Sequence, residues 1–439
     1  MVKAVKFGGS SLASAEQFKK VKNIILSEEE RRFVVPSAPG KRFSDDIKVT
    51  DLLYRCHGEA KVGMDFTHTL DTIKSRYEEI IRGLDLDLSL DDEIAVIAEN
   101  LKKGTSIDYI ASRGEYLNGI VLAKCLGYEF IDSAEVILFD ENGKFLSEET
   151  NEKLSARLST MDNAVLPGFY GSMPNGEVKT FSRGGSDVTG AILARAIRAD
   201  VYENWTDVSG FLAADPRIVE NPEVIEVITY KELRELSYMG AGVLHESVIF
   251  PVRKEGIPVN IRNTNAPEDK GTMIVESTCH VPGHTITGIA GKKGFASVNI
   301  DKDKMNSEVG FGRKVLEVFE NNGISFEHMP SGIDTMTVFV NMEQFIPKEQ
   351  LVLSQLHQAV HPDSIELEAD LALIAVVGRG MRKARGTAGR LFSALAHARV
   401  NVKMIDQGSS ELNIIIGVEE EDFETATRAI YDMFVLPQE

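Results

Sequence analysis

Short apolar runs alternate with longer amphipathic stretches over about the first 278 residues, and this alternation constrains the fold more than any other feature. The short runs predict strands or strand ends at residues 2–7, 33–37, 109–111, 164–167 and 200–203. The longer stretches predict helices over residues 18–25, 67–81, 91–101, 116–125 and 188–198. This order is typical of an α/β domain with a mostly parallel sheet between helices, in which ligands bind at the carboxyl ends of the strands.

The first predicted strand ends in a turn that is suited to holding a phosphate group. Lys6 lies near the end of the strand, and Gly8, Gly9 and Ser10 follow it closely. The lysine offers a point charge, the glycines let the backbone approach an anion, and a helix is predicted just beyond them. An ordinary turn with a solvated lysine would contain the same residues, so this segment alone leaves both readings open.

The same layout of strand, Gly-Gly-Ser turn and helix recurs near residue 185. The turn consists of Arg183, Gly184, Gly185, Ser186 and Asp187, between the apolar run 178–181 and the helical run from 188. An arginine can hold a carboxylate or a phosphate through two parallel hydrogen bonds. At the start of a helix, the aspartate could be a cap, a metal ligand or the partner of a lysine.

A third polar segment follows the predicted strand 200–203. Thr206 and Asp207 lie next to the only tryptophan of the chain, and Asp215 and Arg217 follow shortly after. Polar groups of this kind suit the base or ribose of a nucleotide, and an arginine suits its phosphates. A polar loop without a ligand is the alternative.

Five motifs in register resemble those of the aspartate kinases, within the amino-acid kinase superfamily. They lie at residues 6–11, 112–115, 182–187, 205–208 with 215–217, and 240–245. Their order and spacing match that family along the whole predicted kinase domain, which we place at residues 1–280. The resemblance implies ATP- and Mg²⁺-dependent phosphorylation of the β-carboxylate of L-aspartate to 4-phospho-L-aspartate. That reaction would be the first step of lysine, threonine and methionine biosynthesis.

The resemblance also implies a role for each matching residue, with Lys6 and Asp187 as the catalytic pair. Lys6 would neutralise the β- and γ-phosphates, and Asp187 would orient Lys6 and the metal-bound phosphates; no residue is assigned as a metal ligand. The implied ATP site consists of Lys6, Gly8, Gly9, Ser10, Thr206, Asp207, Phe211, Leu212, Asp215, Arg217, Gly242 and Val243. The implied aspartate site consists of Ser37, Thr50, Glu115, Arg183, Gly184, Gly185 and Ser186. There, Arg183 would bind the α-carboxylate, and Glu115, expected to flank a glycine turn, would bind the α-ammonium group.

Three features depart from the family pattern. Many relatives have a lysine where this chain has Gly242, and a tyrosine where it has Leu212. Residues 40–49 form a longer, charged insert between Ser37 and Thr50. We therefore expect some nucleotide contacts to be made by the backbone, or the nucleotide site to be looser than in those relatives.

The C-terminal part contains an internal repeat of β-α-β-β-α-β order. The first copy is predicted as strand 295–300, helix 311–321, strands 325–329 and 335–340, helix 348–360 and strand 364–367. The second is predicted as strand 371–377, helix 388–398, strands 402–405 and 412–417, and helix 423–433. It lacks a fourth strand, which the apolar run 284–290 can supply. We therefore expect the first module, 295–369, to be inserted in the second, 284–291 plus 370–437.

The two modules resemble ACT domains, which bind amino acids at module interfaces. The resemblance implies a homo-oligomer, such as a homodimer, formed through these modules, and feedback regulation by an end-product amino acid. Lysine is favoured over threonine because Glu327 and Asp334 could hold its ε-ammonium group. The predicted effector site consists of Met305, Ser307, Gly310, Phe311, Phe326, Glu327 and Asp334. A dimerisation domain without a ligand is the alternative.

Composition argues against several classes of function. A net charge of −19 argues against a nucleic-acid partner, which would favour a basic face. No apolar run approaches the roughly 20 residues that a membrane-spanning helix needs. Cys56, Cys125 and Cys279 are isolated from one another, which is typical of a reducing compartment. We therefore expect a soluble, cytoplasmic protein.

Other kinds of kinase and a non-catalytic role are the competing interpretations. The sequence has neither the P-loop motif nor the His-Arg-Asp and Asp-Phe-Gly motifs of protein kinases. Amino-acid kinases that act on acetylglutamate, glutamate or UMP would share residues 6–9. A non-catalytic amino-acid sensor could keep the fold, but the presence of Lys6, Arg183 and Asp187 argues against it.

Overall fold

The computed structural model describes residues 1–182, 184–241, 250–278 and 284–435. It divides into two compact units. The first comprises Met1–Phe211, Val224–Tyr230 and Val243–Thr278, and the second comprises Leu212–Glu223, Lys231–Gly242 and Cys279–Glu439. Two segments that precede residue 280 therefore group with the C-terminal unit. The domain boundaries expected from the sequence stay a prediction.

A mostly parallel sheet of eight strands forms the centre of the first unit, in the order β3-β4-β2-β1-β7-β9-β10-β8. The strands are β1 (Lys3–Phe7), β2 (Phe33–Pro36), β3 (Glu129–Phe130), β4 (Ala164–Val165), β7 (Val201–Thr206), β8 (Val227–Thr229), β9 (Val259–Asn263) and β10 (Thr272–Val275). Neighbouring strands run parallel except for β9 and β10, which pair antiparallel. The α/β fold with a mostly parallel sheet is thus confirmed. A separate hairpin is made of β5 (Tyr170–Ser172) and β6 (Val178–Thr180).

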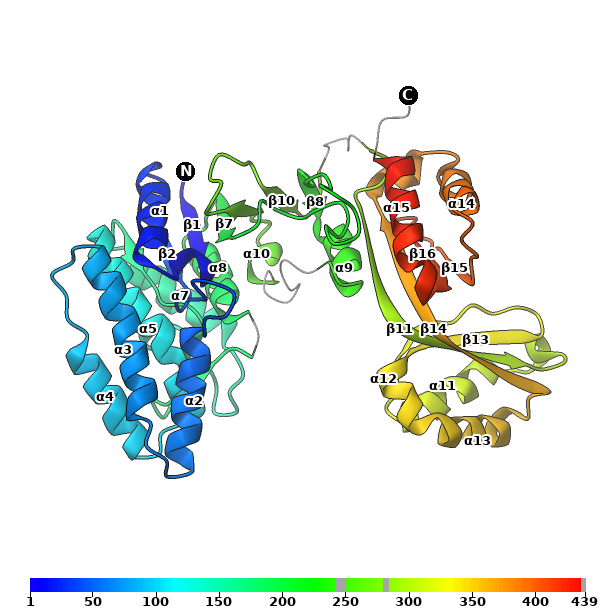
Figure 1. Ribbon diagram of the computed structural model, residues 1–439, viewed down its shortest axis with the longest axis horizontal. Coiled ribbons are helices and arrows are strands. Elements are labelled where there is room, and N and C mark those ends of the chain that lie inside the picture. Colours follow the sequence, from blue (N-terminus) through cyan, green and yellow to red (C-terminus); the bar gives the residue numbers. More distant parts are fainter. Residues whose placement is uncertain (183, 242–249, 279–283, 436–439) are drawn as a thin grey trace. The chain divides into compact units, whose positions relative to one another are not determined.

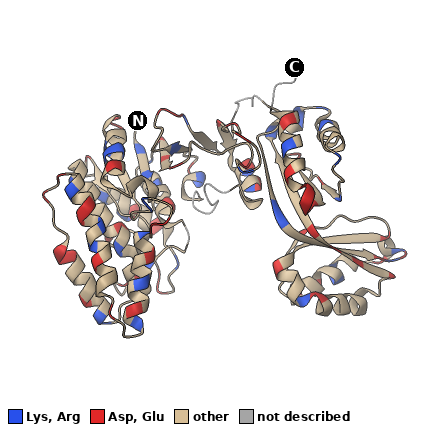
Figure 2. Ribbon diagram, in the orientation of Figure 1, with Lys and Arg blue, Asp and Glu red and all other residues tan. Residues whose placement is uncertain are grey.

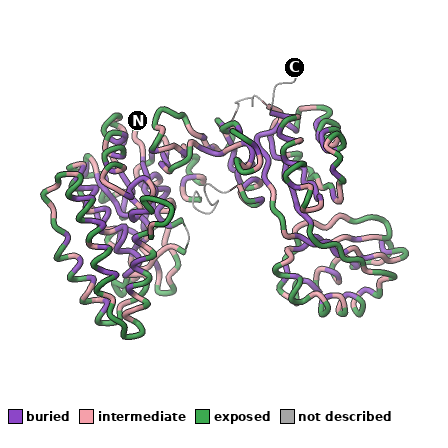
Figure 3. The backbone as a smooth tube through the Cα atoms, in the orientation of Figure 1, coloured by how far each residue is buried: buried purple, intermediate pink, exposed green. Residues whose placement is uncertain are grey.

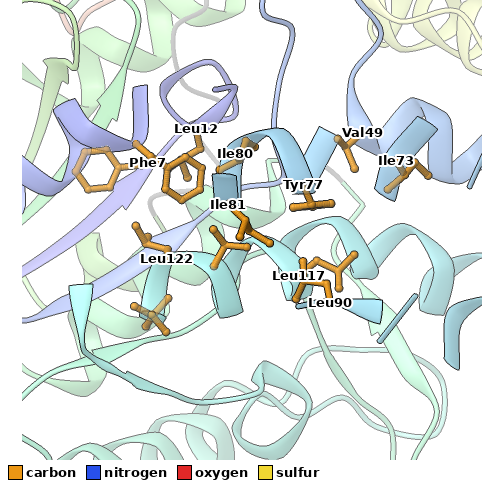
Figure 4. Close-up of a cluster of buried hydrophobic side chains, with 14 of the residues drawn as sticks. Phe7, Leu12, Val49, Ile73, Tyr77, Ile80, Ile81, Leu90, Leu117 and Leu122 are labelled. Carbon is orange, nitrogen blue, oxygen red and sulfur yellow. The ribbon is translucent and has the colours of Figure 1, made fainter. Parts of the chain in front are cut away.

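Helices pack around this sheet (Figure 1). They are α1 (Ala15–Leu26), α2 (Val49–Lys61), α3 (Thr67–Gly83), α4 (Asp91–Lys102), α5 (Ile107–Leu126), α6 (Ser133–Val136), α7 (Ser147–Leu158), α8 (Gly185–Ala196) and α10 (Phe250–Lys254). Phe7 of β1, Leu12, Tyr77 of α3 and Leu117 of α5 belong to one buried hydrophobic cluster, which Figure 4 shows in close-up. Acidic and basic residues are interspersed along α2, α3 and α4 (Figure 2). Burial of the inner faces positions the strand ends that carry the site.

Residues 109–111, which we predicted as a strand, lie in the first turns of helix α5. The hydroxyl of Ser106 caps this helix by accepting a hydrogen bond from the N–H of Tyr109 at 3.2 Å. Ile110 and Ala111 are buried because they face the core, which makes the short apolar run resemble a buried strand. Gly114 and Glu115 therefore lie in the middle of a helix, and the expectation that Glu115 flanks a glycine turn was wrong.

Two long strands form the centre of the second unit. β11 (Gly288–Asp301) and β14 (Ser364–Val377) pair antiparallel, within a six-stranded sheet of order β12-β13-β11-β14-β16-β15. The first half of β11 pairs with the end of β14, next to β16 (Asn413–Glu419) and β15 (Met404–Asp406). The second half of β11 pairs with the start of β14 and with β13 (Thr335–Asn341), which is followed by β12 (Phe326–His328). Figure 1 shows β11 and β14 side by side between the two groups of helices.

This pairing confirms that the first module is inserted in the second, with one difference in detail. Only residues 288–290 of the strand predicted at 284–290 are in a strand, and they belong with 295–300 to one strand, β11. The strands predicted at 364–367 and 371–377 are parts of β14. The chain changes register near Gly294, whose φ of 89° lies in the left-handed region, instead of breaking the strand. A bulge of this kind bends a strand while keeping it paired.

Helices cover the sheet of each module. They are α11 (Phe311–Asn321), α12 (Met342–Phe345) and α13 (Glu349–Val360) in the first module, and α14 (Thr387–His397) and α15 (Phe423–Phe434) in the second. In Figure 3 most strands of the first unit and the second half of β14 are buried, whereas the first half of β14 and the outer turns of the helices are largely exposed. Among the helices of the described residues, none is long and apolar enough to cross a membrane.

Candidate functional site

A cavity of about 550 Å³ lies at the carboxyl ends of β1, β2 and β7 in the first unit. This edge of the sheet is where a doubly wound α/β fold binds its ligands. Eleven residues that we predicted for the ATP or aspartate sites line it together: Lys6, Gly8, Gly9, Ser10, Ser37, Thr50, Glu115, Ser186, Asp187, Thr206 and Asp207. Residues as far apart in the sequence as Lys6 and Asp207 thus contribute to one site.

Lys6 is held at the centre of this site by two side chains from other elements. Its side chain lies near the end of β1, where only 7% of the residue is exposed. The ammonium group is 2.6 Å from the carboxylate of Asp187, and it donates to the amide oxygen of Asn204 at 3.4 Å. The amide nitrogen of Asn204 in turn donates to the same oxygen of Asp187 at 2.8 Å. The three side chains form a closed polar group that fixes one buried cation.

The parallel register of the sheet explains why Asn204 reaches Lys6. Residue 204 of β7 lies directly opposite residue 6 of β1, so both side chains point to the same face. Asp187 reaches the same point from the first turn of α8, which follows Gly184 in the left-handed region at φ 54°. Asn204 is not among the residues predicted from the sequence, because strand register is decided only in the folded sheet.

The turn after β1 is packed tightly against the loop after β2. The N–H of Gly8 donates to the Trp205 carbonyl at 2.9 Å, and the N–H of Gly40 donates to the Gly9 carbonyl at 2.8 Å. A β-carbon on Gly9 would lie 2.8 Å from the carbonyl oxygen of Ala38, and one on Gly40 would lie 2.6 Å from the carbonyl carbon of Gly9. Both positions therefore require glycine, because two backbone segments meet here without room for a side chain.

Glu115 places a buried carboxyl group in the wall of the cavity. Only 6% of the residue is exposed, and burial raises its pKa to about 8 even though the Ala38 N–H and the Ser186 hydroxyl bond to it. Its Oε2 atom has no hydrogen-bond partner among the described residues. An unpaired carboxylate oxygen is costly to bury, so this atom is suited to receiving a cationic ligand group.

Carboxylates at the site fit a magnesium ion that is bound mainly through phosphates. Mg²⁺ is commonly held by one or two carboxylates and by the phosphates of its nucleotide. Asp187 and the exposed Asp207 line the cavity together and provide two such groups. Nowhere in the described part of the chain do three or more His, Cys, Asp or Glu side chains gather as a preformed metal site.

The other residues predicted for these sites do not line the cavity as described. Phe211, Gly184 and Gly185 belong to the first unit; Phe211 is buried, and its N–H donates to the hydroxyl of Thr272 at 2.8 Å. Leu212, Asp215 and Arg217 belong to the second unit, where Arg217 is 2.6 Å from Asp215. Arg183, Gly242 and Val243 lie outside the described residues.

The predicted effector residues all belong to the first module of the second unit. Met305 and Ser307 form a short 3₁₀ helix, and Gly310 and Phe311 begin α11. Asp334 accepts a hydrogen bond from the Lys304 N–H at 2.9 Å, and Glu327 accepts one from the hydroxyl of Tyr238 at 2.5 Å. Phe326 is 47% exposed. Both acidic groups thus already have partners within this unit.

Two lysines of the cavity wall were missed by sequence analysis. Lys41 and Lys48 belong to the charged insert after β2, and both line the cavity. The insert was recognised as a departure from the family pattern, but lysines in an exposed polar stretch are usually solvated. Only the folded loop shows which of its charges face the cavity.

Known protein families and a curated relative match nearly the whole length of this chain. A model of the amino acid kinase family matches residues 1–263, and a model of the ACT domain matches residues 374–434. Aspartokinase 3 of Bacillus subtilis is 39% identical over 449 residues, which cover 99% of this chain and 98% of that protein.

Solved structures agree with these matches. The crystal structure of Clostridium acetobutylicum aspartate kinase is 52% identical, with a TM-score of 0.91 and 99% of each chain covered. E. coli aspartokinase III in complex with aspartate and ADP is 25% identical, with a TM-score of 0.72 and 99% of each chain covered. The same E. coli protein in complex with lysine and aspartate is 26% identical, with a TM-score of 0.72 and coverage of 98% of this chain and 99% of that one.

Proposed function

Because the chain belongs to the amino acid kinase family and, within it, to the aspartokinases, we propose that it transfers the γ-phosphoryl group of ATP to the β-carboxylate of L-aspartate. One observation supports this proposal most directly. The cavity combines the fixed cation Lys6 with the buried carboxyl group of Glu115, whose Oε2 has no partner among the described residues. The cation suits the phosphates of a nucleotide, and the carboxyl group suits the ammonium group of an amino acid, so the cavity offers a site for each ligand.

The chemistry requires positioning more than proton transfer. A carboxylate acceptor is already ionised at pH 7, so the reaction needs no general base. The difficulty is the approach of two anions, which positive charge and backbone N–H groups must offset. Lys6 would bind the β- and γ-phosphates, and the N–H groups of Gly9 and Ser10 would bind the same oxygens. The Gly8 N–H instead donates to the Trp205 carbonyl, and Asp187 would hold Lys6 in place. Mg²⁺ bound near Asp187 and Asp207 would add positive charge to the phosphates.

Aspartate would be held at the other side of Lys6 by groups of α5, α8 and the loop after β2. Glu115 would receive its α-ammonium group, and the hydroxyl groups of Ser37, Thr50 and Ser186 would orient its carboxylates. Arg183 is proposed to bind the α-carboxylate of aspartate, together with Gly184 and Gly185. The E. coli relative was crystallised with aspartate and ADP, which supports this pair of ligands for the cavity.

The nucleotide is proposed to extend from Lys6 along the end of β7. Thr206 and Asp207 line the cavity there. Six further residues are proposed to contact its base, ribose and outer phosphates: Phe211, Leu212, Asp215, Arg217, Gly242 and Val243. They rest on the resemblance of the motifs to those of the family.

The experiment that tests this function measures ADP release with alternative acceptors. We expect turnover with L-aspartate and little with glutamate, N-acetylglutamate or UMP, and hydroxylamine should trap the acyl phosphate product. Turnover with another acceptor and not with aspartate would contradict the proposal. No ADP release with any acceptor would favour a non-catalytic sensor.

Regulation by an amino acid is proposed for the ACT modules, with lysine as the favoured effector. The E. coli relative was crystallised with lysine, and Glu327 and Asp334 remain the acids that could hold the ε-ammonium group. Lysine inhibition of ADP release, with an effect of about 1–3 kcal/mol on aspartate or ATP binding, is the expected result. Inhibition by threonine alone would contradict the choice of lysine. Assembly of a homo-oligomer through the modules is part of the same proposal.

A further inference from the structure

The charged insert between β2 and α2 is a closed loop attached to the phosphate-binding turn. We call residues 40–48 the lysine loop. At its start, the N–H of Gly40 donates to the Gly9 carbonyl at 2.8 Å. At its end, the N–H of Val49 donates to the Pro39 carbonyl at 3.2 Å, and the Val49 side chain is buried in the core (Figure 4). Both ends of the loop are therefore fixed close to one another.

A buried arginine holds the interior of the lysine loop. Arg76 of α3 is 4% exposed, and it donates to the carbonyl groups of Gly40 at 2.9 Å and Ile47 at 3.1 Å. It also lies 3.0 Å from the carboxylate of Asp46, to which Arg42 donates from its side chain and its backbone N–H at 2.9 Å each. These arginines, Arg42 first, hold the pKa of Asp46 well below its usual range. The loop is thus organised before any ligand binds.

Lys41 and Lys48 present their charges to the cavity from this organised loop. Both side chains are exposed and both line the cavity. The ammonium group of Lys41 donates to the Ser44 carbonyl at 3.1 Å, and neither lysine has a carboxylate partner within the described ranges. By contrast, Arg42 of the same loop is fully engaged with Asp46 and Glu79. The loop therefore pairs Arg42, which does not line the cavity, and leaves the two lysines that line it without a carboxylate partner among the described residues.

The charges that line the cavity indicate why two further lysines would favour the binding of anionic ligands. Among the described lining residues, Glu115, Asp187 and Asp207 are acidic, and Lys6 is the only cation outside the loop. Lys6 is moreover already paired with Asp187. Such a wall would repel a nucleotide triphosphate and a dicarboxylate. Lys41 and Lys48 raise the number of lining cations among the described residues to three.

We propose that Lys41 and Lys48 bind the terminal phosphate of ATP and remain in contact with the phosphoryl group during transfer. This inference rests on the proposed function. In that step, a carboxylate oxygen of aspartate forms a bond to the γ-phosphorus while the bond from the bridging oxygen to that phosphorus breaks, and ADP leaves with the electron pair. Both lysines would stabilise the negative charge on the phosphoryl group during its transfer. The lysine loop is thereby a second cationic wall, supplied by a segment that is separate from the turn after β1.

Variants of the two lysines test this proposal against a matched control. Lys41→Ala/Lys48→Ala should lower kcat/KM for ATP by about 10²-fold or more, and Lys41→Arg/Lys48→Arg should retain most of the activity. Lys102→Ala removes an exposed lysine from the last turn of α4 and should change neither kcat nor KM. The activity of the double alanine variant should also depend less on ionic strength, because two charges that attract the nucleotide are gone.

A binding measurement separates this role from a structural one. Calorimetry should show that the double alanine variant loses at least ten-fold more affinity for a non-hydrolysable ATP analogue than for ADP. Equal losses for both nucleotides, or kinetic constants within two-fold of the unaltered protein, would overturn the proposal. An unaltered protein that is inactive with aspartate would instead refute the proposed function, so the two failures can be told apart.

Discussion

Lys6 is a buried cation whose position depends on residues far away in the sequence. Asp187 neutralises it at 2.6 Å, and Asn204 bonds to both side chains. Burying a charge is tolerated when a partner and further hydrogen bonds compensate for the lost water. A phosphate that enters the cavity therefore meets a cation that is already oriented.

We expect Lys6→Ala to lower kcat by about 10²–10³-fold or more while leaving the fold intact, because a preorganised charge contact to the transferring group is lost. Steady-state ADP release measures the effect, and circular dichroism checks the fold. Lys102→Ala serves as the control, since this lysine lies on the outer end of α4. A Lys6→Ala protein with near-normal kcat would remove Lys6 from the catalytic site.

Glu115 should make the protein without ligand less stable as the pH rises. Burial raises its pKa to about 8 in the folded state, whereas an unfolded glutamate titrates near 4.3. Between these values the folded protein binds more protons than the unfolded chain, so the stability present below about pH 4 is lost as the pH rises through 8. Urea unfolding at pH 5.5 and 8 should show this loss, and Glu115→Gln should reduce it.

The same group links aspartate binding to proton release. An α-ammonium group next to Glu115 would favour the ionised carboxylate, so binding near pH 7 should release up to about one proton. Calorimetry in buffers of different ionisation enthalpy measures this number. Glu115→Gln should abolish the proton release, and it should weaken the binding of aspartate more than the binding of ATP. Proton release that is unchanged in the variant would show that another group is responsible.

At the scale of elements, helix α9 (Tyr230–Tyr238) is joined to the second module by a fully buried carboxylate. Glu232 has no exposed surface. It accepts hydrogen bonds from the Arg379 N–H at 2.9 Å and from the Thr287 hydroxyl at 2.6 Å, and it pairs with the Arg379 guanidinium at 2.8 Å. A segment that belongs to the kinase family match thus forms part of the core of the second unit.

We expect Glu232→Ala to destabilise the second unit by about 3–5 kcal/mol, because it removes a fully buried carboxylate that pairs with the largely buried Arg379 guanidinium. The only tryptophan, Trp205, lies in the first unit, so its fluorescence reports that unit separately. The urea transition seen by circular dichroism should move to lower concentration, while the tryptophan transition stays. Glu220→Ala, an exposed site in the same unit, should change stability by less than about 0.5 kcal/mol. Equal effects of the two variants would contradict this role.

At the scale of the whole molecule, the two modules of the second unit share the long strands β11 and β14. The second module obtains one edge of its sheet from residues 288–293, which precede the entire first module. Neighbouring backbone groups of β14 would otherwise lose their hydrogen-bond partners, and an apolar sheet edge would be exposed. The two modules can therefore complete their sheets only in the context of one continuous chain.

A fragment of residues 370–435 should therefore fail to fold alone, because it lacks β11, one of the two strands that pair with β14. A fragment of residues 284–435 contains both long strands and should fold better. Dispersion of the amide signals in two-dimensional NMR spectra distinguishes the two outcomes. A well-dispersed spectrum from the shorter fragment would show that the shared strand is dispensable.

The sequence by itself determined the alternation of elements, the glycine turns after β1 and before α8, and the repeat with its missing strand. These features depend on local periodicity and on residue types that only a few backbone conformations accept, so they can be read without contacts. It also identified Lys6, Glu115 and Asp187 through motif resemblance. It misassigned residues 109–111, because a short apolar run at the start of a largely buried helix resembles a buried strand.

Only the tertiary structure decided which side chains share the cavity. Asn204 reaches Lys6 through strand register, Glu115 enters the wall from the middle of a helix, and the lysine loop is fixed by Arg76 of α3. It also decided that β11 and β14 run unbroken through both modules. Each of these facts depends on contacts between distant segments, whose free energies of packing and desolvation no local pattern contains.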